Sequence, residues 1–584
     1  MKKYVSLVFI FVCIIATKAL FAQSVNVHKA IVKIKIFEAG TKAITPSMVC
    51  ITNSNRTQVV TPPLGMLVDK PSDNDVFFKG VEFEADKKWI GPVRMTSGGG
   101  NNKDRSVLYG IQPSIPYWKA PVMYQTSGEF SIALPAGIWQ ISIEHGNEYL
   151  PITADIVVKK TDTEIKKTFM LRRWINLPKM GWYSGDVHVH HPTNKPAFRD
   201  YLLAYAKAED LHLVNILEMG HHGTGVDAMG HVHAGTDFIQ QGFGQKFRVN
   251  KDNYWLVSGQ EDPRSRFGHI IGLNIEQMVR DTTLYDYYDL VFKNLKMQPG
   301  ALIGFAHFAW NVSWNMQNVT TGFPWYITTN QIDFVELLQF LKLNTLDYYD
   351  YLNLGFRITA AAGSDFPWAS TIGEVRTMVY TGKHFNADSW FAALKAGHTY
   401  VTNGPALFLT ADGKMPGSEI VKQQGVAIKI SARALSNPAI GAIKKIAVYN
   451  NEGLVAEMNN INNADSIELN LNHQLKRSQW IAAVVNCDNG AVAHTTPIYV
   501  VVDGKPTYDL QKAPAIIEKQ VQSIENLMKE DTVKPSIDEG LIERYKTAIL
   551  FYKMLLYQID AEKKGVVNRI GAAVFNNNVN TFPV

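Results

Sequence analysis

Apolar and polar residues alternate with period two through the first third of the chain. The segments Val32–Ile36, Phe130–Leu134 and Trp139–Ile143 each place every second residue on one side of an extended chain, as half-buried β-strands do. The turn Pro135-Ala136-Gly137 separates the last two segments, which is the pattern of a β-hairpin. We therefore predict an N-terminal β-sandwich domain over residues 23–175.

The pattern changes over residues 176–405. Short apolar runs at 211–217, 302–305 and 334–338 alternate with helix-like stretches such as 197–209. Strands that alternate with helices are typical of an α/β fold with parallel strands.

The last part of the chain returns to strands and then becomes helical. Residues 426–430 again alternate, and Asn451-Glu452-Gly453 supplies a turn, so we predict a second all-β domain, of the sandwich type, over 406–505. Beyond it, apolar residues recur at helical spacing in two groups: Ile517, Val521, Ile524 and Met528, and then Ile542, Tyr545, Ile549, Tyr552 and Ile559. We predict that residues 506–584 form a helical tail packed against the body.

The N-terminus has the pattern of a secretory signal. Lys2 and Lys3 precede a short apolar run over 5–16, and Ala22 supplies the small residue that signal peptidase requires. We predict cleavage after Ala22 and a periplasmic or secreted protein, with an uncleaved anchor as the alternative. No later segment reaches about 18 apolar residues, so no transmembrane segment is expected after cleavage.

Composition narrows the partners and the chemistry. The chain is 46% hydrophobic and 19% charged, which fits globular domains, and its net charge of +5 includes no stripe of Lys and Arg, which argues against nucleic acid. Cys13 leaves with the signal, and Cys50 and Cys487 lie too far apart in sequence to indicate a disulfide framework, although one bridge stays open. Any metal is therefore expected on His and carboxylate ligands.

Histidines cluster in the predicted α/β region. Ten of the sixteen fall between His188 and His307. If residues 182–189 form a strand, His188 and His190 point to the same face because strand side chains alternate. An H-x-H pair alone is a weak signal, but four more polar residues occur at the ends of predicted strands: Glu261, His269, His307 and Asp365. That order is typical of a β/α barrel whose mouth holds metal.

These segments resemble the PHP (polymerase and histidinol phosphatase) superfamily of metal-dependent hydrolases, in its carbaryl hydrolase (CehA/McbA-like) branch. The resemblance rests on GWYSGDVHVH (181–190), GQEDPRSRFGHIIGLN (259–274), GFAHF (304–308), AAGSDFP (361–367) and TNGP (402–405). It implies a distorted β/α barrel over 176–405, and the segment before it is similar to the β-sandwich that often precedes this barrel.

The resemblance also implies a binuclear metal site. One divalent ion would take His188, His190, Glu261 and Asp365. The second would take His269 and His307, and Glu261 would bridge both ions. Zn, Mn and Fe suit such ligands comparably.

The chain departs from the superfamily pattern at the position of a third metal. Pro367 stands where many members carry a His, and an Asp-His pair is replaced within 217–222. The third site is therefore expected to be missing or remodelled. Five further histidines could rebuild it or could simply line the mouth: His191, His221, His222, His231 and His233.

Other polar residues have two readings each. Arg264 and Arg266 could clamp an anionic part of the substrate or form salt bridges to Asp262 or Glu374. Glu336, near Asp333 on a predicted strand, could approach the mouth or pair at the edge of the core. Asn403 could reach into the site or cap a turn.

We predict a hydrolase in which a metal-bridging hydroxide attacks an ester, carbamate or amide bond of a small-molecule or oligosaccharide substrate. Glu261, His307 and Arg264 are the expected catalytic residues, with His307 and His269 acting as metal ligands rather than bases. A phosphoesterase with the same site is one alternative. A non-catalytic carbohydrate-binding protein with a relic barrel is another, which the intact ligand set disfavours. No G-x-S-x-G motif accompanies the His cluster, which argues against a serine esterase.

Overall fold

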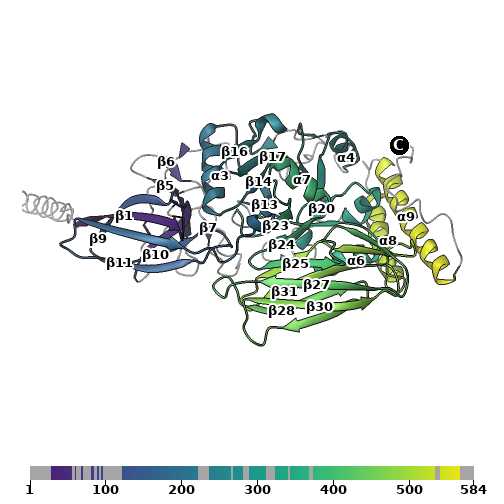
Figure 1. The fold of residues 1–584 in the computed structure, drawn as a ribbon. Coiled ribbons are helices and arrows are strands. Elements are labelled where there is room, and N and C mark those ends of the chain that lie inside the picture. Colours follow the sequence, from purple (N-terminus) through teal and green to yellow (C-terminus); the bar gives the residue numbers. More distant parts are fainter. Residues whose placement is uncertain are drawn as a thin grey trace, which may run out of the picture.

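The chain folds into a β-rich N-terminal region, a central region in which strands alternate with helices, a second β-rich region and a final pair of helices (Figure 1). The computed structural model describes residues 28–41, 43–54, 122–220, 236–264, 267–280, 288–310, 322–339, 342–366, 372–532 and 539–565, with the backbone of short strands between 59 and 95. Strands dominate and form several sheets. The predicted β-rich character and the helical tail are confirmed, whereas the predicted signal segment lies outside the described residues.

Two sheets face each other in the N-terminal region. In the first, β1 (Lys29–Glu38) lies between β12 (Glu164–Leu171) and β9 (Glu129–Pro135); in the second, the order is β11 (Ile152–Val158), β10 (Gly137–Glu144), β2 (Ser47–Asn53) and β8 (Val122–Thr126). The period-two pattern buries Val32, Ile34 and Ile36 of β1 against Ile141 and Ile143 of β10 in one core. The remaining strands here are β3 (Val59–Val60), β4 (Val68–Asp69), β5 (Val81–Phe83), β6 (Lys88–Ile90) and β7 (Arg94–Met95).

The central region is built on one long sheet. Its parallel strands are β13 (Trp182–Val189), β14 (Leu213–Gly220) and β17 (Tyr254–Arg264), and then β19 (Leu302–Phe305), β20 (Phe334–Gln339) and β22 (Thr359–Ala362). Antiparallel strands complete it: β15 (Thr236–Asp237), β16 (Val249–Lys251), β18 (Gly268–Leu273), β21 (Lys342–Leu343) and β23 (Arg376–Tyr380).

The first and last parallel strands of this sheet come together. A parallel bridge joins Val189, at the end of β13, to Phe366, just beyond β22. Side chains from several of the strands share one apolar cluster that includes Val187, Leu217 and Phe334. The carboxyl ends of the parallel strands therefore meet around a common point, which is where the polar residues of the sequence pattern lie.

Helices connect and cover these strands. The longer ones are α3 (Pro196–Ala208), α4 (Asp289–Lys296), α6 (Thr345–Asn353) and α7 (Ala387–Lys395), and the short ones are α5 (Phe323–Tyr326), η3 (Pro178–Met180), η4 (Gln245–Phe247), η5 (Phe308–Trp310) and η6 (Ile327–Thr329). Pro196 starts α3, where its missing N–H costs nothing, and Asn386 and Ser389 form a capping box on α7. The predicted helix over 197–209 is thus confirmed to within a residue.

The sheet continues into the second β-rich region, because β24 (Thr399–Thr402) pairs with β23 on one side and with β32 (Val492–Thr495) on the other. Its other strands are β26 (Glu419–Lys422), β28 (Ile443–Asn450), β29 (Gly453–Asn459), β31 (Gln479–Cys487) and β33 (Ile498–Val502), and they face a separate sheet of β25 (Ala406–Ala411), β27 (Ala427–Leu435) and β30 (Ser466–Gln474). Leu407 and Ile430 from one sheet meet Ile446 and Val485 from the other in a shared core.

The chain ends in α8 (Ala513–Thr532) and α9 (Glu539–Lys563), which lie side by side. Their apolar faces bury Ile524 and Tyr545 against the body, and the Tyr552 hydroxyl donates to the Pro324 carbonyl.

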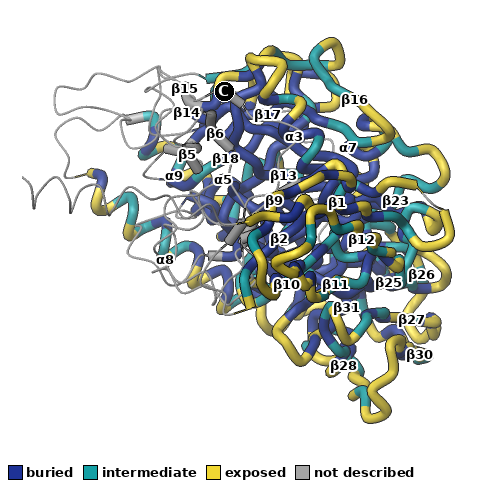
Figure 2. The backbone as a smooth tube through the Cα atoms, turned by 90° about the vertical axis from the view of Figure 1, so that its left-hand side faces the viewer, coloured by how far each residue is buried: buried dark blue, intermediate teal, exposed yellow. Residues whose placement is uncertain are grey.

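Buried residues run through the central strands, and exposed residues lie mainly toward the outside (Figure 2). Within the described part of the chain, no helix is long and apolar enough to span a membrane. Cys50 and Cys487 are buried free thiols, so the open disulfide alternative is excluded.

Candidate metal centre

The histidine pair at the end of β13 forms the centre of the site. His188 and His190 are both fully buried, and their Nε2 atoms lie 3.0 Å apart. One residue separates them in a strand, so their side chains leave the same face, as the sequence predicts.

Hydrogen bonds on the other ring nitrogens fix the tautomer that each ring has when it is neutral. His188 Nδ1 lies 2.8 Å from Glu336 Oε1, and His190 Nδ1 lies 3.2 Å from the Leu217 carbonyl oxygen. Carboxylate and carbonyl oxygens only accept hydrogen bonds, so both Nδ1 atoms are the donors. In neutral rings, each Nε2 then carries a lone pair, and two lone pairs face each other at 3.0 Å.

Two carboxylates face the same point. Glu261 Oε2 lies 3.1 Å from His190 Nε2, and Glu261 Oε1 lies 3.4 Å from His188 Nε2. Asp365 Oδ1 lies 3.4 Å from His188 Nε2 and 3.6 Å from His190 Nε2. When both rings are neutral, these buried acceptors converge without a donor and repel one another, and a positive charge between them removes that repulsion. This donor set fits a divalent metal ion.

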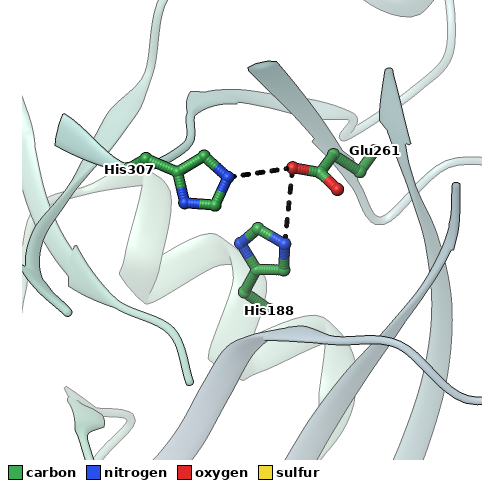
Figure 3. A group of neighbouring side chains, drawn as sticks. All are labelled: His188, Glu261 and His307. Atoms are coloured by element: carbon green, nitrogen blue, oxygen red, sulfur yellow. Dashed lines mark ion pairs between the residues drawn. The ribbon is translucent and has the colours of Figure 1, made fainter. Parts of the chain in front are cut away.

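Glu261 also faces a second group of ligand atoms. His269 Nδ1 lies 3.0 Å from Glu261 Oε1, and His307 Nε2 lies 3.4 Å from the same oxygen. The two imidazole nitrogens are 3.1 Å apart. Figure 3 shows the Glu261 carboxylate facing the rings of both His188 and His307. A carboxylate in this position can contribute to two adjacent metal ions.

Two of the candidate ligands have an uncommon backbone conformation. His307 has φ 58° and Asp365 has φ 50°, in the left-handed region that non-glycine residues seldom adopt. Hydrogen bonds hold both: the His307 N–H donates to Glu336 Oε2 at 2.8 Å, and the Asp365 N–H donates to the His188 carbonyl at 2.8 Å. Such strain costs about 1–3 kcal/mol for each residue, and it concentrates at functional sites.

Asp186 holds the loop that carries Asp365 against β13. Its fully buried carboxylate accepts hydrogen bonds from the backbone N–H groups of His188, Ser364 and Gly373, at 3.1, 2.9 and 3.1 Å. Burial raises the pKa of Asp186 to about 6, although these hydrogen bonds act in the opposite direction. Asp186 therefore ties the first and last segments of the site together.

The carboxylates favour the protonated forms of the neighbouring histidines. Burial lowers the pKa of His188, but Glu336, Glu261 and Asp365 outweigh it and raise that pKa well above its usual value. The pKa of His307 is also raised, to about 9, because Glu261 and Asp365 outweigh its burial. Burial raises the pKa of Glu261, yet the facing charges of His188 and His269 bring it well below the usual value. Positive charge, whether of protons or of metal ions, is needed to balance the negative charge of the carboxylates in this pocket.

The structure brings together all six metal ligands that the sequence predicts. They are His188, His190, Glu261, His269, His307 and Asp365. Arg264 is the last residue of β17, but its side chain lies outside the described residues. The same holds for the whole of Arg266, Pro367, His221, His222, His231 and His233.

Two other candidates have contacts away from the six ligands. The His191 ring stacks on Tyr201 of α3, and burial lowers its pKa to about 4. The Asn403 side-chain oxygen accepts a hydrogen bond from the Val492 N–H at 2.7 Å, so this side chain contacts the start of β32. Of the two carboxylates on the predicted strand, Glu336 reaches the site, while Asp333 binds Lys296 and the Ile303 N–H at the other end of β20.

The sequence did not identify several residues that contact the candidate ligands. Gln339 accepts a hydrogen bond from His307 Nδ1 at 2.9 Å. Phe238, with φ 61°, places its ring 5.1 Å from the ring of His190. Only Gln339, one residue beyond a predicted buried strand, has a position that could have drawn attention.

Comparisons with known proteins add little. No family model matches the chain, and no curated protein matches it. The structure is similar to that of PsfC from Pseudomonas syringae PB-5123, with 15% identity and a TM-score of 0.26 over 37% of this chain and 89% of that one. It is also similar to fibronectin(III)-like modules of Clostridium thermocellum CbhA, with 18% identity and a TM-score of 0.13 over 17% of this chain and 97% of that one. These scores are too low to support an argument about function.

Proposed function

We propose that this protein is an exported, metal-dependent hydrolase that cleaves an ester, carbamate or amide bond. The observation that carries the proposal is that the buried Nε2 atoms of His188 and His190 each lie within 3.6 Å of a carboxylate oxygen of Glu261 and of one of Asp365. A second pair of imidazoles meets the same Glu261, so the chain offers ligands for two ions. Imidazole and carboxylate ligands suit Zn, Mn or Fe.

We further propose that the central region is a distorted β/α barrel of the PHP superfamily, in the carbaryl-hydrolase-like branch. Two observations support this assignment. The parallel strands direct their carboxyl ends to one point, and the Val189–Phe366 bridge brings the first and last of them together. Polar residues at strand ends are the usual positions of active-site groups in such barrels.

The chemistry follows from the ligand set. Divalent ions held here would lower the pKa of a water molecule toward neutrality and stabilise the negative charge that develops on the substrate oxygen. Glu261 joins the two ligand groups, and His307 and His269 serve as ligands rather than as proton acceptors. Arg264, at the end of β17, would hold an anionic or strongly polar part of the substrate.

Metal content and turnover test this proposal together. The full-length protein is purified without chelator, its metal is measured by elemental analysis, and hydrolysis of aryl acetates, aryl carbamates and aryl phosphates is followed. We expect close to two ions per chain, and turnover that stops with chelator and returns with Zn²⁺ or Mn²⁺. His190→Ala should lose metal and activity, while His28→Ala, at an exposed histidine of the N-terminal region, should keep both.

Two results would change the proposal. Absence of bound metal, with none taken up on addition, would refute a metal-dependent enzyme. Turnover of aryl phosphates without turnover of esters or carbamates would replace the proposed bond with a phosphoester. Export is tested separately, because cleavage after Ala22 leaves a mature chain that begins at Gln23, and mass spectrometry of the protein recovered outside the cytoplasm reads that terminus directly.

A further inference from the structure

Glu336 contacts both groups of candidate ligands. It is fully buried on β20, and its two carboxylate oxygens have different partners. Oε1 accepts a hydrogen bond from His188 Nδ1 at 2.8 Å, and Oε2 accepts one from the His307 N–H at 2.8 Å. One side chain therefore links a ligand of the first group to a ligand of the second.

Gln339, at the end of the same strand, extends this link. Its side-chain nitrogen donates to Glu336 Oε2 at 3.0 Å, and its side-chain oxygen accepts from His307 Nδ1 at 2.9 Å. The protonated nitrogen of His188 and that of His307 are thus both fixed by β20. In each ring, Nε2 is left as the atom that faces Glu261.

Gly363 leaves the space that this arrangement needs. A Cβ atom at position 363 would lie 2.3 Å from Glu336 Oε1 and 2.4 Å from His188 Cβ. A side chain at this position would push Glu336 and His188 apart. The loop after β22, which carries Gly363, therefore leaves room for the contact between His188 of β13 and Glu336 of β20.

We propose that Glu336 is a positioning residue that fixes the two ligand groups relative to each other, and thereby sets their affinity for divalent cations. The inference rests on the proposed metal-dependent function. A carboxylate bonded to the distal nitrogen of a ligating histidine orients the ring and makes its other nitrogen a stronger ligand, and loss of such a partner typically weakens metal binding about 10–100-fold. Because Glu336 also fixes the backbone of His307, both groups should respond to its removal.

Cobalt titration tests this role without relying on activity. The metal-free full-length protein is titrated with Co²⁺ against a competing chelator, and the visible absorption of the bound ion is recorded. For Glu336→Gln we expect about 10–100-fold weaker binding in both ligand groups and a changed absorption spectrum. The matched control is Asp333→Asn, which removes a carboxylate at the other end of β20 and should bind Co²⁺ within about twofold of wild type.

A second variant should affect one ligand group more than the other. Gln339→Met removes the partner of His307 Nδ1 but keeps the His188–Glu336 hydrogen bond, so it should weaken the group that contains His307 more than the other. It also keeps the inference testable if Glu336→Gln does not fold.

The outcomes are distinguishable. If wild type binds no Co²⁺, the proposed function fails and this inference fails with it. If wild type binds Co²⁺ and Glu336→Gln binds it with the same affinity and spectrum, only the role of Glu336 is refuted. Equal losses in Glu336→Gln and Asp333→Asn would also refute it, because any disturbance of β20 would then have the same effect.

Discussion

Gly363→Ala should disturb the site through contact alone. The backbone of Gly363 does not have a positive φ, so alanine can adopt its conformation without strain. The added methyl group, however, would lie 2.3 Å from Glu336 Oε1 and 2.4 Å from His188 Cβ, both in fully buried residues. Real contacts of this kind stay beyond 3.0 Å, so one of the two partners has to move.

The expected magnitude combines two effects. Overpacking a dense interior costs about 1–3 kcal/mol. Displacing Glu336 also lengthens its 2.8 Å hydrogen bond to His188, and hydrogen bonds to charged groups contribute about 1.5–3 kcal/mol. Since the movement relieves part of the overlap, we expect a local loss of about 3 kcal/mol.

Hydrogen exchange measured by mass spectrometry is the suitable assay, because a multidomain chain rarely unfolds in one step. A loss of about 3 kcal/mol corresponds to about 100-fold faster exchange in peptides covering β13 and β20. Gly404→Ala is the comparison: its methyl group would meet Ala491 and Ile440 side chains at 3.1 and 3.3 Å, so a small adjustment suffices. If Gly363→Ala exchanges no faster than Gly404→Ala in β13, and binds Co²⁺ as wild type does, the steric reasoning is wrong.

Three further predictions concern other parts of the molecule. Glu261→Gln removes the carboxylate shared by both ligand groups, so bound metal should fall below one ion per chain by elemental analysis; retention of two ions would contradict a bridging role. Burial lowers the pKa of His494 to about 4, so the stability that depends on its neutral ring is present above pH 6.5 and is lost as the pH falls toward 4, by at most about 3 kcal/mol. His494→Gln should therefore flatten the dependence of the free energy of urea unfolding on pH. The same pH dependence in the variant and in wild type would contradict this prediction. Ile524→Ala deletes a fully buried side chain of α8 and should cost about 3 kcal/mol in the unfolding transition that includes the helical pair; a loss below about 1 kcal/mol would mean that α8 is not anchored there.

The strand pattern of the sequence drew attention to the six candidate residues, and the resemblance to the PHP superfamily implied their assignment as ligands of two ions. The strand over 182–189 follows from its apolar residues, and alternation then requires His188 and His190 to share a face. Glu261, His307 and Asp365 follow from their positions at or just beyond the ends of buried runs, because the ends of parallel strands gather on one side of a sheet. Their gathering at one edge of the sheet follows from local periodicity and the direction of the chain, whereas their division between two ions came from the resemblance.

The supporting contacts could not be predicted in the same way. His188 and Glu336 are 148 residues apart, and no local pattern states which carboxylate will meet which imidazole. Few residues other than glycine adopt the left-handed backbone of His307, and although histidine is enriched among them, its identity alone does not predict that conformation; in the structure the His307 N–H donates to Glu336. Glu336 therefore had two open interpretations in the sequence, and only the packing of β13, β19 and β20 decides between them.

The same packing implies that Gly363 and Glu336 act through one contact, and a double-mutant cycle measures this. Glu336→Ala removes the carboxylate oxygen that the methyl group of Gly363→Ala would meet at 2.3 Å, although the 2.4 Å contact with His188 Cβ remains. Gly363→Ala should therefore cost less in the Glu336→Ala background than in wild type, with a coupling of about 1–2 kcal/mol, within the range of residues in direct contact. Strictly additive losses would mean that crowding of His188 alone accounts for the glycine, and that Gly363 does not serve the His188–Glu336 pair.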